Sequence, residues 1–254
     1  MTAPPAHSST ASNAIHLNPA NGPTRFAAPG GPKLSRELRS ILELPRLARH
    51  ATSLIRLPRG NQTAMVFPGW GTSDLFMAPL RSTLRSLGHE PHGWGLGFNA
   101  GEVEALLPSI EYSVAHLAAT ADGPITLIGW SLGGIFAREV ARNRPDLVQQ
   151  VITYATPVYG GPKYTRGARA YDQEQLDRLE SRVAERNQIP LQRPVTALYS
   201  KADAIVDWQA CIDDFSPVVN NIELQSTHVG MTIDPDAWKI TAELLAYPPA
   251  THEQ

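Results

Sequence analysis

The chain has 254 residues, 42% of them hydrophobic, which is enough for one sizeable core, and α/β folds of this length are commonly a single domain. Its formal net charge of -2 gives no overall attraction to nucleic acid or anionic lipid, so a generally basic nucleic-acid-binding protein is excluded. The single cysteine, Cys211, excludes an internal disulfide framework.

The amino-terminal region, residues 1–32, is dominated by Ala, Pro, Ser, Asn and Gly without periodicity, which predicts a disordered leader. It lacks the basic region followed by an apolar core that marks a signal peptide. No apolar run in the chain approaches the ~18 residues that a membrane span needs. We therefore expect a soluble, cytoplasmic protein.

Residues 33–60 change in character, because leucine and isoleucine recur at helical spacing among an excess of arginines. Pro45 is expected to break this segment into two short helices. The simplest interpretation is an amphipathic helical extension that covers the rest of the protein, with its arginines in water. The alternative is peripheral contact with a membrane or a partner through residues 33–59.

From residue 61 to about 250 the chain alternates short apolar strands with amphipathic helices, which predicts one domain with a mostly parallel central sheet and helices on both faces. The expected strands are 63–67, 90–94, 125–130, 148–156, 194–200 and 219–225. The expected helices are 74–87, 102–120, a segment from 132 to about 143, and 236–245. Ligands of such sheets bind at the carboxyl ends of the strands.

Residues 158–193 interrupt this alternation with a Gly- and Tyr-rich stretch followed by a helix-like segment. Because the insertion follows a strand directly, it is expected to form a short cap over the carboxyl ends of the sheet. The alternative is a surface excursion that does not contact substrate.

The sequence Gly129-Trp130-Ser131-Leu132-Gly133 follows an apolar strand and precedes an amphipathic segment. Glycines on both sides of the serine allow a strand and a helix to pack closely around a tight, strained turn. Such a turn presents the serine hydroxyl at the top of the sheet, so Ser131 is the expected nucleophile.

A serine hydroxyl is a poor nucleophile at neutral pH, so it needs a base, and the base needs a group that orients it. In this architecture the chain order is serine, acid, histidine. His228 and His252 lie beyond the last plausible acid, and His252 belongs to the tail after Pro248 and Pro249. His228, which follows the last expected strand, is therefore the predicted base.

Two aspartates compete for the role of the acid. Asp203 stands just past the strand 194–200, before an apolar pair that can anchor its loop. Asp207 precedes a helix-like run over 208–215, so its simplest role is a helix cap. We favour Asp203.

Acyl transfer also needs hydrogen-bond donors for the developing oxyanion. One predicted donor is the backbone N–H of Leu132, the residue after the nucleophile. The other is the backbone N–H of Trp70, in the glycine-containing turn 68–71 after the first strand. The alternative for this loop is an ordinary tight turn.

Several stretches together resemble the α/β-hydrolase superfamily, in particular its small serine esterase and lipase-like members. They are Phe67-Pro68-Gly69-Trp70-Gly71, residues 93–99, residues 129–134, Ser200-Lys201-Ala202-Asp203 and Thr227-His228-Val229-Gly230-Met231. The resemblance implies Ser131 as nucleophile, Asp203 as acid, His228 as base, and Trp70 with Leu132 as oxyanion donors. Pro68 stands where many relatives have histidine, and there is no Gly-Gly-Gly run, which argues against the esterases that use one.

The expected function is therefore carboxylic ester hydrolysis through a covalent acyl-enzyme on Ser131, without a metal or organic cofactor. The expected substrate is a small-molecule ester or acyl compound with an apolar group. An acyltransferase or thioesterase would use the same three residues, and a non-catalytic binding protein could share the fold. The sequence indicates no nucleic-acid partner and does not predict an oligomeric state.

Overall fold

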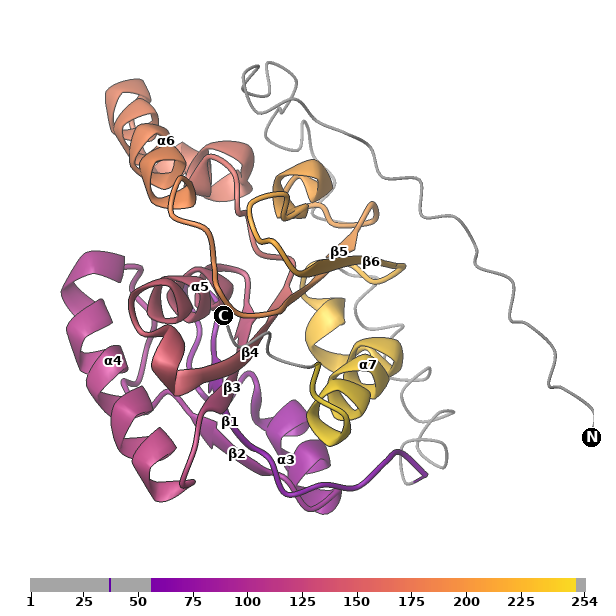
Figure 1. Cartoon of the computed structure of the whole chain (residues 1–254). Helices are drawn as coiled ribbons and strands as arrows, with labels where there is room; N and C mark the ends of the chain where they lie inside the picture. The colour runs from indigo at the N-terminus through magenta and orange to yellow at the C-terminus, as the bar shows by residue number, and fades with distance from the viewer. Residues whose placement is uncertain (1–36, 38–55, 250–254) are drawn as a thin grey trace, which may run out of the picture.

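The computed structural model describes Glu37 and residues 56–249, and it arranges six parallel strands in one sheet of order β2-β1-β3-β4-β5-β6 (Figure 1). The strands are β1 (Thr63–Phe67), β2 (Glu90–Gly93), β3 (Ile125–Trp130), β4 (Val148–Tyr154), β5 (Val195–Ser200) and β6 (Val219–Leu224). Every strand pairing among these residues is parallel, so the carboxyl ends of all six strands meet at one edge of the sheet.

Strands β1 and β3 are buried along their whole length, whereas the edge strands β2 and β6 are partly exposed. In β4 and β5 one residue each is partly exposed, while β2 and β6 contain one buried residue each among exposed and partly buried ones. A parallel strand covered on both faces reads as a continuous apolar run, which is why the sequence shows β1 and β3 clearly.

Helices cover both faces of the sheet, as the alternation of elements predicts. They are α3 (Ala78–Ser86), α4 (Val103–Thr120), α5 (Leu132–Asn143), α6 (Gln173–Asn187) and α7 (Pro235–Ala246). Figure 1 shows α4 and α5 on one side of the sheet and α3 and α7 on the other. Phe136 of α5 packs in one apolar cluster with Met65 of β1, and Trp238 of α7 packs in the other cluster with Val66. The predicted fold class is therefore confirmed.

Helix α3 begins at Ala78, later than the start at residue 74 that the apolar spacing predicts. The Asp74 carboxylate accepts hydrogen bonds from the backbone N–H groups of Trp94 (3.0 Å) and Gly95 (3.1 Å), in the loop after β2. Its side chain therefore holds a neighbouring loop and does not lie at the start of the helix.

Three short segments make up most of the insertion between β4 and β5. They are the 3₁₀ turns η3 (Gly161–Tyr164) and η4 (Arg166–Ala170), followed by α6, which Figure 1 shows standing apart from the helices that cover the sheet. Asp172 and Gln175 form a capping box at the start of α6. The side-chain amide of Asn187 donates to the carbonyl of Val158 (2.8 Å), which joins the end of the insertion to its beginning.

The predicted leader, residues 1–32, and nearly all of the predicted extension lie outside the described residues. Residues 56–60 form a turn and irregular backbone before β1. Within the part of the chain that the structure describes, no helix combines the length and hydropathy that would carry it across a bilayer.

Candidate active site

Ser131 lies in a strained turn between the carboxyl end of β3 and the first residue of α5. Its backbone has φ 54° and ψ -123°, a conformation that residues with a Cβ rarely adopt. Neighbouring groups hold it there: its N–H donates to the carbonyl of Tyr154 (2.7 Å), and its own carbonyl accepts from the Thr156 hydroxyl (3.0 Å). This is the turn that the glycine-flanked serine predicts.

Glycine is required on both sides of this serine because the backbone packs against itself. A Cβ on Gly129 would collide with the backbone of Gly133, and a Cβ on Gly133 would collide with the carbonyl of Phe67 in β1. The predicted close packing of strand and helix is therefore confirmed.

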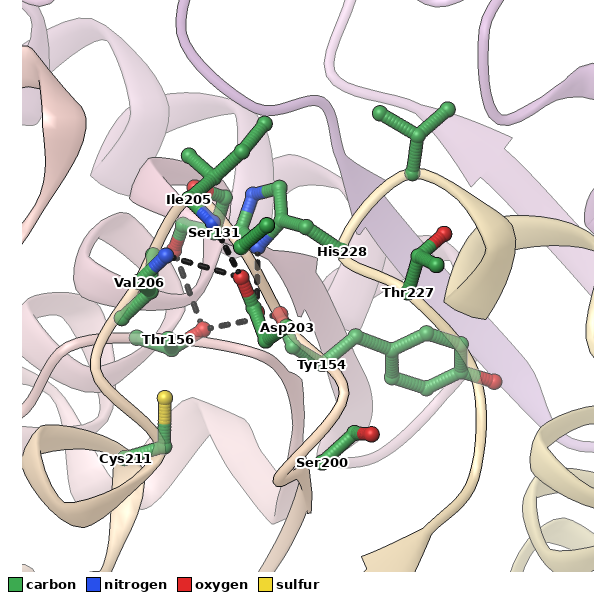
Figure 2. Close-up of polar contacts among 12 residues, drawn as sticks. Ser131, Tyr154, Thr156, Ser200, Asp203, Ile205, Val206, Cys211, Thr227 and His228 are labelled. Atoms are coloured by element: carbon green, nitrogen blue, oxygen red, sulfur yellow. Dashed lines mark hydrogen bonds and ion pairs between the residues drawn. The ribbon is translucent and has the colours of Figure 1, made fainter. Parts of the chain in front are cut away.

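The structure brings His228 and Asp203 together. His228 Nδ1 lies 2.7 Å from Asp203 Oδ2, and the two side chains are only 3% and 1% exposed. The other oxygen of Asp203 accepts hydrogen bonds from the backbone N–H groups of Ile205 (2.7 Å) and Val206 (2.8 Å), as Figure 2 shows. A carboxylate is an acceptor, so Nδ1 is the donor and Nε2 of a neutral ring keeps its lone pair for another proton.

Trp130, next to the serine, also holds the histidine loop. Its indole N–H donates to the carbonyl of His228 (3.1 Å), and the two rings lie 5.2 Å apart between centroids. Phe76 also stacks on the indole, with the ring centroids 4.7 Å apart. The ring of His228 is thus held by its hydrogen bond to Asp203 and by its contact with the Trp130 indole.

A large cavity opens at Ser131 and His228. Its volume is about 1190 Å³, and its lining is mainly apolar. Residues from the cap insertion, α4 and α5 line it, including Leu107, Ile135, Val158, Leu179 and Val183. Among the described residues the Ser131 hydroxyl makes no hydrogen bond to His228; such catalytic bonds often tighten only when substrate is bound.

The two predicted oxyanion donors border this cavity. In residues 56–249, the backbone N–H groups of Trp70 and Leu132 donate to no protein acceptor, as two oxyanion donors would require. The turn of Trp70 is held by Asn99, whose buried side-chain amide donates to the carbonyl of Pro68 (2.8 Å). The carbonyl of Asn99 also accepts from the N–H of Gly71 (2.9 Å).

The competing acid, Asp207, has the role of a cap. Its carboxylate accepts from the N–H of Gln209 (3.0 Å) at the start of a 3₁₀ turn, η5 (Trp208–Cys211), which is shorter than the helix-like run expected over 208–215.

Burial, together with the nearby Asp203 and Asp207 carboxylates, raises the pKa of the Cys211 thiol, as expected for an inert packed cysteine.

Sequence reasoning did not identify Asn99, Thr156 or Glu37. Glu37 is buried, and its carboxylate contacts the loops of Asp203 and His228. Its place in an Arg-rich segment gave no signal of this contact.

Within Glu37 and residues 56–249, no three His, Cys, Asp or Glu side chains gather closely enough to hold a metal ion.

Comparison with known proteins finds one matching family model and two relatives of similar sequence. The model of the α/β-hydrolase fold family matches residues 83–212. The chain is 32% identical over 106 residues to the biotin biosynthesis bifunctional protein BioHC of Teredinibacter turnerae, a match covering 39% of this chain and 18% of that protein. It is 32% identical over 103 residues to the pimeloyl-(acyl-carrier protein) methyl ester esterase of Aliivibrio salmonicida, covering 40% of this chain and 39% of that one.

These matches thus span less than two-fifths of the length of either relative. Among solved structures, Aspergillus fumigatus lipase B superposes with a TM-score of 0.58 at 18% identity, over 76% of this chain and 54% of the lipase. At that identity the likeness shows a shared fold.

Proposed function

The chain belongs to the α/β-hydrolase family, and from that premise we propose that it is a serine hydrolase that cleaves carboxylic esters through an acyl-enzyme on Ser131. One observation carries the proposal: the buried Asp203–His228 hydrogen bond of 2.7 Å lies at the same cavity as a serine in a strained strand-to-helix turn. This combination supplies a nucleophile, a base and the group that orients the base.

The proposed reaction begins when His228 Nε2 takes the Ser131 hydroxyl proton as Oγ attacks the ester carbonyl. The backbone N–H groups of Trp70 and Leu132 stabilise the oxyanion. Collapse of the intermediate breaks the bond to the alcohol, which leaves with the proton from His228. Water then gives a proton to His228 and attacks the acyl-enzyme, and the acid departs as Ser131 recovers its hydrogen. Asp203 stabilises the imidazolium in both halves of the reaction.

The cavity supports a substrate with an extended apolar acyl group. Ser131 and Asn143, at opposite ends of α5, both line it, and a helix rises about 1.5 Å per residue, so the cavity follows α5 for about 18 Å. Leu132 and Ile135 of α5 line the part of the cavity near Ser131, whereas Arg138 and Glu139 line the part toward Asn143. One curated relative is named as a methyl ester esterase and one solved structure as a lipase, which agrees with an ester of this kind.

The test combines active-site labelling with hydrolysis. A fluorophosphonate probe should label the wild-type protein once, and p-nitrophenyl esters of increasing acyl length should be cleaved with a preference for longer chains. Ser131→Ala should abolish both. Ser113→Ala is the matched control, because within the described part of the chain the Ser113 hydroxyl bonds only to the carbonyl of Ser109 in α4.

Full esterase activity in Ser131→Ala would refute the assignment. A folded wild-type protein that takes up no probe would favour a binding protein. Product analysis with an added alcohol separates hydrolysis from acyl transfer. Comparing an oxygen ester with a thioester of the same acyl group shows which of the two substrates is preferred.

A further inference from the structure

Glu37 is the one described residue amino-terminal to position 56, and it contacts the candidate site directly. The residue is 8% exposed. Its Oε1 accepts hydrogen bonds from the backbone N–H groups of Ala204 (3.1 Å) and His228 (3.3 Å), and its Oε2 accepts from the N–H of Val229 (3.1 Å). A single carboxylate therefore serves three backbone donors that lie 167 to 192 residues away in the sequence.

These three donors belong to the two loops that carry the proposed acid and base. Ala204 follows Asp203 in the loop after β5, and His228 and Val229 lie in the loop after β6. The three consecutive N–H groups of residues 204–206 are divided between two carboxylates: Glu37 accepts the first, and Asp203 accepts the other two. The loops are thus joined twice, through the Asp203–His228 bond and through Glu37.

We propose that Glu37 is a positioning residue for the hydrolase reaction, which fixes the Asp203 loop and the His228 loop relative to each other; this inference rests on the proposed function. Glu37 binds the backbone N–H of His228 and that of Ala204, the residue after Asp203, so it sets the distance across which the His228 ring meets Asp203. Hydrogen bonds to an ionised acceptor are the stronger kind, which suits a link that must hold two loops rigid.

The chemistry of the link requires a carboxylate. Three donors converge on two oxygens, and a glutamine would offer one oxygen and one NH₂ group. In one orientation of the amide the NH₂ group would face the N–H of Val229, and in the other it would face the N–H groups of Ala204 and His228. In either case two donors would face each other. An alanine would leave all three N–H groups without this partner, those of Ala204 and His228 being buried and that of Val229 partly buried. The expected order of function is therefore Glu, then Gln, then Ala.

The experiment compares full-length wild type, Glu37→Gln and Glu37→Ala, with Glu90→Gln as the control for loss of one carboxylate at an exposed position of β2. Steady-state hydrolysis should show kcat falling by between about 10-fold and 100-fold in Glu37→Ala. KM should change little, because among the described residues Glu37 makes no hydrogen bond to the cap insertion, α4 or α5, which supply most of the cavity wall. The kcat of Glu37→Gln should lie between those of wild type and Glu37→Ala, and the kcat of Glu90→Gln should match that of wild type. The rate of fluorophosphonate labelling should follow kcat.

A spectroscopic measurement separates positioning from general stability. The proton between His228 Nδ1 and Asp203 should give a downfield proton NMR resonance in wild type that shifts or broadens in both Glu37 variants. Wild-type kcat, labelling rate and resonance in a folded Glu37 variant would overturn the inference and leave the proposed function intact. If Glu37→Ala does not fold, Glu37→Gln decides by the same readouts. A wild-type protein that takes up no probe would refute the proposed function, while the resonance would still test the link.

Discussion

Replacing Asp203 by asparagine tests the acid with almost no change of shape. The asparagine oxygen can still accept from the N–H groups of Ile205 and Val206, so the loop keeps two of its hydrogen bonds. The NH₂ group then faces His228 Nδ1 as a donor, which forces the ring into the tautomer whose Nε2 carries the proton. A base in that tautomer cannot take the Ser131 proton.

The expected loss in kcat is about 10⁴-fold, the effect known for this substitution in a serine protease triad, or about 5 kcal/mol of transition-state stabilisation. The assay is p-nitrophenyl ester hydrolysis with thermal unfolding measured in parallel. Asp207→Asn is the matched control, because it changes a carboxylate four residues away that caps η5, and its kcat should stay close to wild type. A larger loss in Asp207→Asn than in Asp203→Asn would refute this assignment of the acid.

Two further variants test the supports of the site. Asn99→Ala removes the bond to the Pro68 carbonyl, so we expect about 2 kcal/mol less stability in thermal unfolding and a kcat lower by up to about 10²-fold, the effect of one misplaced oxyanion donor. Asp213→Asn breaks a buried ion pair with Arg138 and should lower the free energy of unfolding at pH 7 by about 3 to 5 kcal/mol. Burial alone would raise the pKa of Asp213, but the Arg138 guanidinium outweighs burial and lowers this pKa below 3.8. The ion pair therefore stabilises the fold fully above pH 3.8. As the pH falls below 3.8, the difference in unfolding free energy between wild type and Asp213→Asn should shrink.

Unchanged melting and activity in Asn99→Ala would show that the turn of Trp70 is held by its backbone alone. For Asp213, denaturant unfolding between neutral pH and pH 3 is the measurement. A difference that stays constant over this range would mean that the charge of Asp213 contributes nothing to stability.

Local patterns were sufficient for most of the fold. The bounds of β1 and β3 agree with the predicted 63–67 and 125–130, because a strand buried on both faces is apolar at every position. The start of α3 was predicted too early, since the spacing of apolar residues continues into turns that are not helical. What Asp74 binds depends on a loop about 20 residues further along the chain, and periodicity carries no information about such a contact.

The site was predictable where chain order and strand ends constrain it. The rule that the acid and the histidine follow the serine left His228 as the better of two histidines, and the position after a strand separated Asp203 from Asp207. The structure places Asp203 and His228 in contact, while their catalytic roles stay predictions. Glu37 could not be predicted, because it acts on backbone N–H groups, which have no sequence signature, from a segment whose composition points only to a helix.

The contact of Glu37 bears on the alternative that residues 33–59 bind a membrane. The Glu37 carboxylate is buried against the loops of Asp203 and His228, so this side chain cannot also enter lipid. We therefore expect no co-sedimentation of the full chain with anionic vesicles at physiological salt. Binding that weakens strongly when Arg36 and Arg39 become glutamine, by about 1 kcal/mol per charge, would instead support membrane contact. Substitution is the better test than removal of residues 1–59, because removal would also take away Glu37 and alter the active site for a separate reason.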